Sequence, residues 1–149
     1  CESSAASDVY KRQHNVECVP RLDSTVRDAR ASFSQSIGIL KKAKQLRPDI
    51  LTKSSIMVGV GETDDEIIQA LELLRDAEVD LITIGQYLAP SPNHLPVDRF
   101  PEPSQYDDWS ASLEEMGFLG WACGPLVRSS YKAGELLAKA SARLRTDKE

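Results

Sequence analysis

The fold of this chain is decided by one stretch, Thr52-Lys53-Ser54-Ser55-Ile56-Met57-Val58-Gly59-Val60-Gly61-Glu62-Thr63-Asp64-Asp65-Glu66. Its first part, Leu51 to Val58, predicts a buried strand, because short polar residues lead into Ile-Met-Val. The two glycines that follow allow a tight turn, since glycine adopts backbone conformations closed to other residues. Thr63 and Glu66 have the spacing of a capping box, which satisfies two free amides at the start of a helix. The stretch therefore predicts a strand, a turn and a helix.

The same alternation extends in both directions. The predicted elements are a helix from Ser32 to Leu46 ended by Arg47-Pro48-Asp49, a strand over Leu81–Ile84, a proline-rich loop over Gln86–Pro103, a helix capped by Ser104 and stopped by Gly117, and a last strand over Phe118–Ala122. Strands and helices that alternate with short links are typical of a parallel α/β sheet. Because there is no internal repeat, we predict one α/β domain.

Composition narrows the class of protein. The chain has 149 residues, with Lys+Arg 18 against Asp+Glu 23 and a formal net charge of −5. It carries no basic run, so nucleic acid is not an expected partner. It has no apolar run of the roughly 20 residues that span a bilayer, so a membrane is not expected either. Its three cysteines are too scattered for a disulfide framework, which favours a reducing compartment.

A second informative stretch lies near the C-terminus, Gly124-Pro125-Leu126-Val127-Arg128-Ser129-Ser130-Tyr131-Lys132-Ala133-Gly134-Glu135. It places a Gly-Pro turn, an arginine and two hydroxyls before a helical pattern that runs to about Arg145. Judged locally, Ser129 or Ser130 is an N-cap of that helix, and Arg128 could form an ion pair with a nearby carboxylate. The local pattern leaves a functional role open beside these structural ones.

Four blocks of the chain together resemble the lipoyl synthase family. The stretch just quoted is similar to the family's C-terminal R-S-S-Y motif, and Thr52–Thr63 to its T-K-S-x-[IL]-M-x-G-x-G-E-T segment. Asp80–Ser91 with His94-Leu95-Pro96-Val97 resembles D-x-[LV]-T-x-G-Q-Y-L-x-P-[ST]…H-L-P-V, and His14–Leu22 resembles N-H-N-x-E-T-V-P-R-L. The likeness runs in the same order from about His14 to about Leu137. Four ordered blocks are far more specific than one motif.

The resemblance implies a fold and a cofactor site. The expected fold is the C-terminal part of a radical-SAM partial (β/α) TIM-like barrel with a C-terminal helical extension. In such barrels the ligand binds at the carboxyl ends of the strands. Residues there that we expect to bind cofactor are Asn15, Ser55, Gly59, Glu62 and Gln86. Ser55–Glu62 also resembles the adenine-supporting G-x-I-x-G-x-x-E pattern, although Ser55 and Met57 depart from it. An ordinary turn that Glu62 braces is the alternative.

The resemblance also implies roles near the second stretch. Ser130 is expected to ligate an iron of an auxiliary [4Fe–4S] cluster, and Arg128 to act in catalysis by stabilising the serine oxygen or the cluster charge. A serine oxygen is a weaker ligand for iron than a thiolate, which suits a cluster consumed as a sulfur donor. His94 could approach the clusters or cap a turn. Cys18 is expected in the core and Cys123 as an inert thiol rather than a metal ligand.

The cysteines do not match the family. Lipoyl synthases carry the triplets C-x3-C-x2-C and C-x4-C-x5-C, whereas Cys1, Cys18 and Cys123 are far apart. Clusters need thiolates at short spacings. We therefore expect a C-terminal fragment, inactive by itself, with both triplets upstream. Residues 1–13 match no block and are predicted to be a non-native or disordered leader, and 14–149 to be the barrel portion with its extension.

For the full-length parent the resemblance implies a sulfurtransferase that inserts two sulfur atoms at C6 and C8 of a protein-bound octanoyl group. Its cofactors would be two [4Fe–4S] clusters and S-adenosyl-L-methionine. Its partners would be an octanoylated lipoyl carrier domain or H protein and an electron donor such as ferredoxin or flavodoxin. It would be cytoplasmic in a bacterium, and mitochondrial or plastid in a eukaryote. The alternative is a non-catalytic α/β binding module that kept a radical-SAM scaffold.

Overall fold

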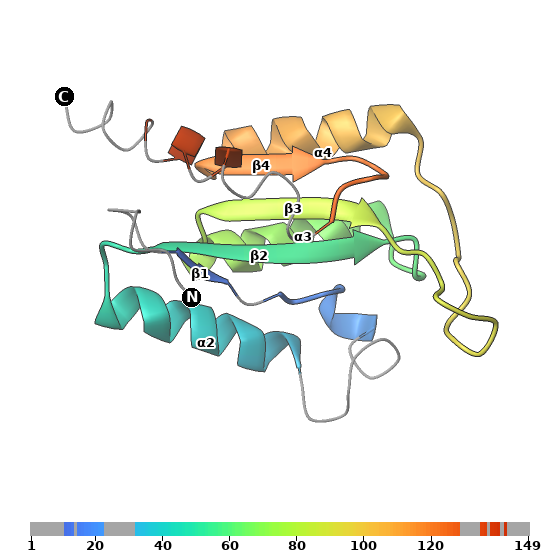
Figure 1. Cartoon of the computed structure of the whole chain (residues 1–149), viewed down its shortest axis with the longest axis horizontal. Helices are drawn as coiled ribbons and strands as arrows, with labels where there is room; N and C mark the ends of the chain where they lie inside the picture. Colours follow the sequence, from blue (N-terminus) through green and yellow to red (C-terminus); the bar gives the residue numbers. More distant parts are fainter. Residues whose placement is uncertain are drawn as a thin grey trace.

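The computed structural model describes residues 11–13, 15–22, 32–128, 135, 136, 138–140 and 142. In this part of the chain, strands and helices alternate as predicted (Figure 1). The elements are β1 (Lys11–Gln13), the short 3-10 helix η2 (Pro20–Leu22), α2 (Phe33–Leu46), β2 (Leu51–Val58), α3 (Asp64–Asp76), β3 (Leu81–Gln86), α4 (Pro103–Met116) and β4 (Gly120–Cys123). The predicted α/β class is confirmed.

The four strands form one parallel sheet in the order β1-β2-β3-β4. Each strand is joined to its neighbour through a helix, so the carboxyl ends of all the strands lie at one edge. Figure 1 shows α2 beside β1 and β2, α3 behind β2 and β3, and α4 along β4. Strands that pair in chain order through intervening helices are the arrangement of a (β/α) barrel. The structure therefore confirms the predicted segment of such a barrel.

The two faces of the sheet have different covers. Ile56 and Ile84 point to the helical side and belong to the main core. On the opposite pleat, Leu51 and Leu81 contact Leu136 of the C-terminal helical residues. Because Leu51 and Leu81 are the first residues of their strands, this contact covers the amino-terminal end of that face. The carboxyl-terminal end of the same face carries the pocket described below.

An acidic carboxyl group joins the elements at the amino-terminal end of the sheet. Asp80 Oδ2 lies 2.5 Å from Lys44 Nζ of α2 and accepts a 3.0 Å bond from Thr52 N of β2. The Asp80 carbonyl accepts bonds from Leu119 N and Gly120 N, at 2.9 and 3.2 Å. One buried aspartate thus connects α2, β2 and the start of β4.

Most helix ends follow the predicted chemistry. Ser32 Oγ accepts a 3.1 Å bond from Gln35 N at the start of α2, and the capping box of Thr63 and Glu66 is present at the start of α3. Gly117 ends α4 in the left-handed conformation, with φ 90°. The predicted Ser104 cap is wrong, because α4 begins at Pro103 after Glu102, which makes no side-chain cap. Proline is favoured at the first helical position, since its φ is preset and it has no N–H to be capped.

Three boundaries also differ from the prediction. β3 continues to Gln86, and β4 runs over Gly120–Cys123 because Phe118 N donates to Leu113 O and closes the end of α4 instead. The sequence predicts Lys11–Gln13 to be part of the leader, but these residues form β1 and pair with Leu51–Lys53. Strand pairing at the sheet edge is a tertiary contact, and it cannot be predicted from the sequence of three residues. The non-native origin of residues 1–13 stays a prediction.

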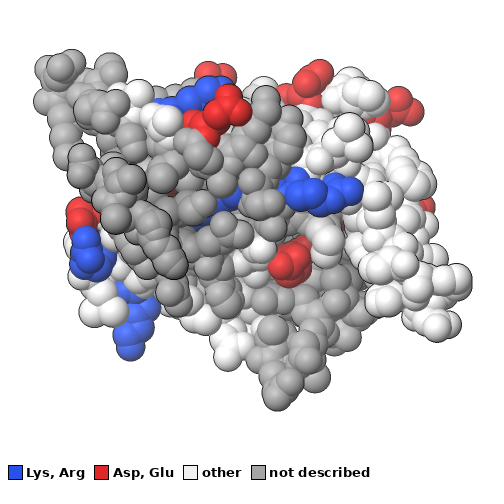
Figure 2. Space-filling view, viewed as in Figure 1, with Lys and Arg blue, Asp and Glu red and all other residues white. Residues whose placement is uncertain are grey.

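The helix α4 is amphipathic. It buries Tyr106, Trp109 and Leu113 against the core, with the first two rings in edge contact at a centroid distance of 5.2 Å. Its outer surface exposes the carboxylates of Asp107, Asp108, Glu114 and Glu115. Figure 2 shows acidic side chains along this upper edge. The buried face of α4 therefore packs on the core while its charged face points to solvent.

Two glycine substitutions test the packing at the carboxyl edge. A Cβ at Gly85 would collide with the Val127 carbonyl oxygen, whereas nothing lies within 4 Å of one at Gly38 in α2. Gly85→Ala should lower the free energy of unfolding by about 1–3 kcal/mol, because overpacking displaces the segment after β4. Gly38→Ala should raise it by about 0.5–1 kcal/mol through helix propensity. Urea unfolding measures both, and equal effects would show that this contact does not constrain the fold.

Candidate functional site

A pocket of roughly 210 Å³ opens at the carboxyl edge of the sheet. It is lined by Asn15, Glu17, Ser55, Ile56, Met57, Gly85, Gln86, Leu88, Val127 and Arg128. Four of the predicted site residues are among them, namely Asn15, Ser55, Gln86 and Arg128. Gly59 and Glu62 do not line it, and Ser130 lies outside the described residues. The fold thus collects residues from distant parts of the chain at the edge where a (β/α) barrel binds its ligand.

The alternation of β2 places Ser55 toward the pocket. Its hydroxyl accepts a 2.9 Å bond from Thr83 Oγ1 on β3. Ser54 faces the other way and accepts a 3.1 Å bond from Val16 N, which fixes the segment that follows β1. Adjacent serines therefore serve two faces of one strand, because successive side chains of a strand point to opposite sides.

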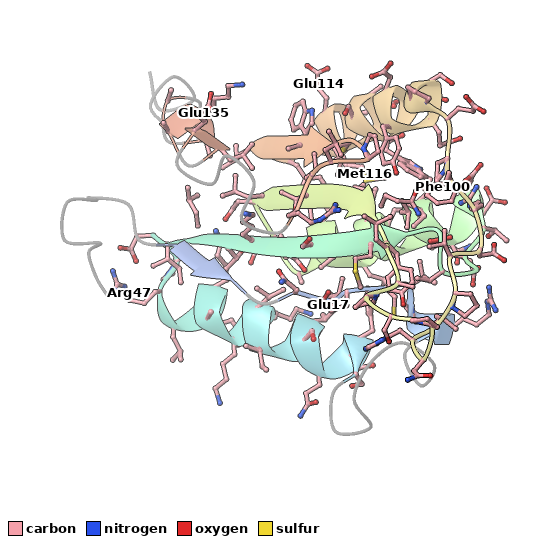
Figure 3. The ribbon with its side chains drawn as sticks, turned by 45° about the vertical axis from the view of Figure 1, so that its right-hand side comes forward. Glu17, Arg47, Phe100, Glu114, Met116 and Glu135 are labelled. Carbon is pink, nitrogen blue, oxygen red and sulfur yellow. The ribbon has the colours of Figure 1, made fainter. Side chains whose placement is uncertain are left out.

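The wall formed by Asn15 and Glu17 continues the sheet beyond β1. Glu17 N donates to Ser55 O at 3.0 Å, and Met57 N donates to Glu17 O at 2.8 Å. Figure 3 shows Glu17 between β2 and α2. Glu17 lines the pocket but is not among the site residues predicted from the sequence. The available signal was its place between the buried Val16 and Cys18, where an acidic residue is unusual.

Glu62 braces the turn after β2. Its Oε1 accepts a 2.7 Å bond from Gly59 N, and its Oε2 lies 3.6 Å from Arg99 Nη2 without a hydrogen bond. The side chain is buried, and this desolvation raises the pKa of Glu62 above its usual range, against the lowering effect of the amide bonds. The predicted alternative, a bracing role, is therefore present in the structure. A contact of Glu62 with cofactor stays a prediction.

The side-chain amide of Gln86 is held by main-chain groups. Its Nε2 lies within hydrogen-bond distance of the carbonyl oxygens of Val58, Tyr87 and Arg99, at 3.3, 3.0 and 3.0 Å. Its Oε1 accepts a 3.4 Å bond from Tyr106 of α4. These bonds tie the end of β3 to the end of β2, to the loop that follows and to α4. Gln86 therefore shapes the pocket edge, and its direct contact with a cofactor stays a prediction.

Arg128 lies exposed at the pocket rim. Its Nη1 donates to Val127 O at 2.8 Å and to Pro125 O at 3.3 Å, which folds the side chain over the Gly-Pro turn. In the described part of the chain it forms no ion pair, so the structural pair considered above is not present there. A guanidinium has five donors, and those not used here can reach an anionic group. The N-cap of Ser129 or Ser130 falls outside the described residues.

The remaining candidates have structural places. Cys18 is fully buried in the core, as predicted. Burial raises the pKa of Cys123 to about 11, which leaves it a thiol at neutral pH. His94 Nδ1 lies 2.7 Å from Ser91 Oγ in an exposed turn, which confirms the turn-capping alternative. Among the described residues no group of three or more His, Cys, Asp or Glu side chains could hold a metal ion. These residues thus do not fit a cluster by themselves.

A pair of charged residues joins the first wall to the turn after β2. Arg21 Nε donates to Glu66 Oε2 at 2.7 Å, and Arg21 Nη2 donates to Glu66 Oε1 at 3.0 Å and to Gly61 O at 2.7 Å. The arginine bonds, with help from the Thr63 amide, lower the pKa of Glu66 from 4.5 to about 2. The capping box of α3 therefore also anchors η2.

The fold and the pocket define a segment of a (β/α) barrel with a pocket at the carboxyl edge of its sheet. No protein-family model matches the chain. Similar proteins include the mitochondrial lipoyl synthase of Xenopus laevis, 52% identical over 89% of this chain and 35% of its own length. That of Homo sapiens is 49% identical over 89% and 35%, and the lipoyl synthase of Sorangium cellulosum 48% over 91% and 40%.

By sequence the chain belongs to the lipoyl synthase family, as predicted from its four blocks. It spans about a third of the length of the curated relatives it matches, 35% of the Xenopus laevis protein. The eukaryotic relatives are named mitochondrial and the bacterial one is not. None of the helices in the described ranges is both long and apolar enough to cross a membrane.

The low pKa of Glu66 predicts a definite acid response. A carboxyl whose pKa is depressed on folding stabilises the fold above its unfolded value of 4.5, and this contribution is lost as the pH falls toward about 2. The difference in stability between wild type and Glu66→Gln should therefore shrink between those two values. Urea unfolding at a series of pH values measures it, with the Glu66 carboxyl carbon titrated by NMR. A Glu66 midpoint near 4.5 would show that the arginine bonds do not form in solution.

Proposed function

We propose that this chain is the C-terminal part of a lipoyl synthase, an enzyme that inserts two sulfur atoms at C6 and C8 of a protein-bound octanoyl group. One observation carries the proposal. The four sequence blocks shared with the family each send a residue to the same pocket, namely Asn15, Ser55, Gln86 and Arg128. A barrel scaffold kept for another purpose would have no reason to retain all four at one edge. The identity of about half with lipoyl synthases supports the same conclusion.

We propose that the pocket holds part of an S-adenosylmethionine molecule. It combines an amide, a hydroxyl, a carboxylate and a guanidinium with the apolar Ile56, Met57, Leu88 and Val127. Such a mixture suits a ligand that has both a charged amino-acid end and a flat heterocycle. We assign direct binding to Asn15, Ser55 and Arg128. Gly59, Glu62 and Gln86 contribute to cofactor binding through the shape of the edge.

The chemistry of the full-length enzyme depends on its cofactors. When bound, S-adenosylmethionine and two [4Fe–4S] clusters supply the radical that removes hydrogen from C6 and C8 and the sulfur atoms that replace it. The residues of this chain bind and orient the cofactor and exclude water from it. Ser130 is proposed as an oxygen ligand to the auxiliary cluster, and Arg128 is proposed to stabilise that oxygen by a charge-assisted hydrogen bond. The thiolate ligands come from the remainder of the parent protein.

The proposed partners follow from the reaction. The octanoyl group is carried by a lipoyl carrier domain or an H protein, and electrons come from a donor such as ferredoxin or flavodoxin. We propose a mitochondrial or plastid location for a eukaryotic parent and a cytoplasmic one for a bacterial parent. The names of the relatives support the mitochondrial alternative for eukaryotes.

A chimera tests the proposed function. Residues 11–149 replace the matching part of the Sorangium cellulosum lipoyl synthase, which is 48% identical to the chain. We expect the chimera to restore lipoylated carrier protein in a bacterium that lacks its own lipoyl synthase, as read by mass spectrometry. The chain alone, the control, should yield no product. A chimera that folds and binds its iron without product would instead favour a non-catalytic binding module.

Ser130 variants of the chimera separate a ligand from an N-cap. Ser130→Ala should abolish lipoyl formation while S-adenosylmethionine cleavage largely survives, because only the auxiliary cluster loses a ligand. Ser130→Cys should hold iron more tightly and slow sulfur release. Ser129→Ala should cost only the roughly 1 kcal/mol of a helix cap. The measurement is lipoyl product per S-adenosylmethionine cleaved. Near wild-type yield from Ser130→Ala, or from Ser130→Asn, would remove the ligand role.

A further inference from the structure

Glu17 occupies a strained turn in the pocket wall. Its φ is 71°, and Cys18 N donates to Val16 O at 2.8 Å across it. A three-residue turn of positive φ is rare, and a left-handed conformation costs a non-glycine residue about 1–2 kcal/mol. Such a conformation persists only when the surrounding structure holds it in place. The question is which contacts hold Glu17 there.

One set of contacts lies on the β2 side. The main chain of Glu17 bonds Ser55 O and Met57 N, as in a short continuation of the sheet. Val16, Cys18 and Val19 are buried in the core. These contacts fix the turn and the two residues that follow it, but the chain then leaves the core at the exposed Pro20.

A second set of contacts lies just beyond, at Arg21. Its guanidinium bonds both oxygens of Glu66 and the carbonyl of Gly61, so it joins η2 to the turn after β2 and to the first turn of α3. Arginine is the side chain that can make this fork, because its donors lie in one plane and match a carboxylate. Glu66 is held in turn by Thr63 N at 2.9 Å. The downstream end of the pocket wall is thus attached to the turn that follows β2 and to the start of α3.

We propose that Arg21 is a positioning residue for the pocket: its fork on Glu66 and Gly61 holds the strained Glu17 turn against β2. The segment from Val16 to Arg21 is then fastened at both ends to the same strand and its following turn. Glu17 and Asn15 keep their places in the pocket wall for that reason. The consequence for S-adenosylmethionine binding rests on the function proposed above. The opposing view is that an exposed ion pair contributes little and that the buried apolar residues suffice.

The chain offers a matched control. Arg47 makes the same kind of fork on Asp49, at 3.0 and 2.9 Å, and its side chain is 60% exposed against 56% for Arg21. Its partner Asp49 is more exposed than Glu66, and Arg47 does not line the pocket. Loss of a surface fork as such is therefore measured by Arg47→Met. If Arg21→Met has a larger effect than Arg47→Met, the difference is due to the contacts of Arg21 beside the pocket wall.

The first test is hydrogen exchange in the chain itself. Arg21→Met should speed exchange at the amides of Glu17 and Met57 by about tenfold, or about 1.4 kcal/mol of local opening. The amide of Asp80, which donates to Thr52 O at the far end of the sheet, should not change. Arg47→Met should leave the amides of Glu17 and Met57 as they are in the wild type. Equal exchange in the two variants would overturn the proposal.

The second test is S-adenosylmethionine binding by the chimera, measured by equilibrium dialysis. Arg21→Met should weaken binding by about tenfold, equivalent to about 1.4 kcal/mol, and Arg47→Met should not. Glu66→Gln keeps the capping box, so it should weaken binding less, and the double variant should be no worse than Arg21→Met. Unchanged affinity in Arg21→Met would overturn the positioning role. A wild-type chimera that binds no S-adenosylmethionine would overturn the proposed function. The hydrogen-exchange test alone would then decide whether Arg21 holds the Glu17 turn against β2.

Discussion

The carboxyl edge of the sheet depends on a close approach of main chain at Gly59. This residue has φ 93°, and a Cβ there would collide with the Arg99 carbonyl oxygen and with the Gln86 amide. Only glycine combines that conformation with the absence of a side chain. The approach lets Asp98 N donate to Gly59 O at 2.7 Å, which brings the proline-rich loop onto the end of β2. The positions of Gln86, Arg99 and Glu62 all follow from this contact.

The two ends of the sheet are built for different tasks. At the amino-terminal end, Asp80 is satisfied by Lys44 and by the amide of Thr52, and the first residues of β2 and β3, Leu51 and Leu81, are apolar and buried. At the carboxyl-terminal end, Ser55 and Thr83 share one hydrogen bond, and a pocket opens beside them. A fully bonded end stabilises the fold, whereas an end with free space and polar groups offers room for a ligand. This division is general for barrels of alternating strands and helices.

Two carboxyl groups beside the pocket are held by hydrogen bonds. Glu62 is buried with one oxygen bonded to the Gly59 amide, and the attraction of Arg99 partly offsets its desolvation. Glu66 is more exposed and is stabilised as a carboxylate by Arg21. Two acidic residues in one short segment thus have pKa values shifted in opposite directions, because one is desolvated and the other is paired. Both act on the shape of the turn after β2.

The residues by themselves determine most of the elements and the family. Helix ends at Ser32, Thr63 and Gly117, and the full extent of β2, follow from local rules of capping, glycine conformation and hydrophobic pattern. The order of the four blocks is likewise a property of the chain alone, and the pocket-lining places of Asn15, Ser55, Gln86 and Arg128 could be anticipated from it. Local rules failed at Ser104, because a proline one residue earlier already satisfied the geometry of the first helical turn.

Only the tertiary structure decided what each side chain of the edge does. Gln86 faces the main chain of two neighbouring segments, and Glu62 turns back on Gly59, because contacts between residues distant in sequence set these orientations. Glu17 lies in the pocket wall because of a turn of positive φ. Neighbouring contacts hold this turn, and no local pattern predicts it. Lys11–Gln13 became a strand only because β2 offered an edge to pair with. Propensity and spacing act over a few residues, whereas pairing, burial and close approach depend on where the rest of the chain has been placed.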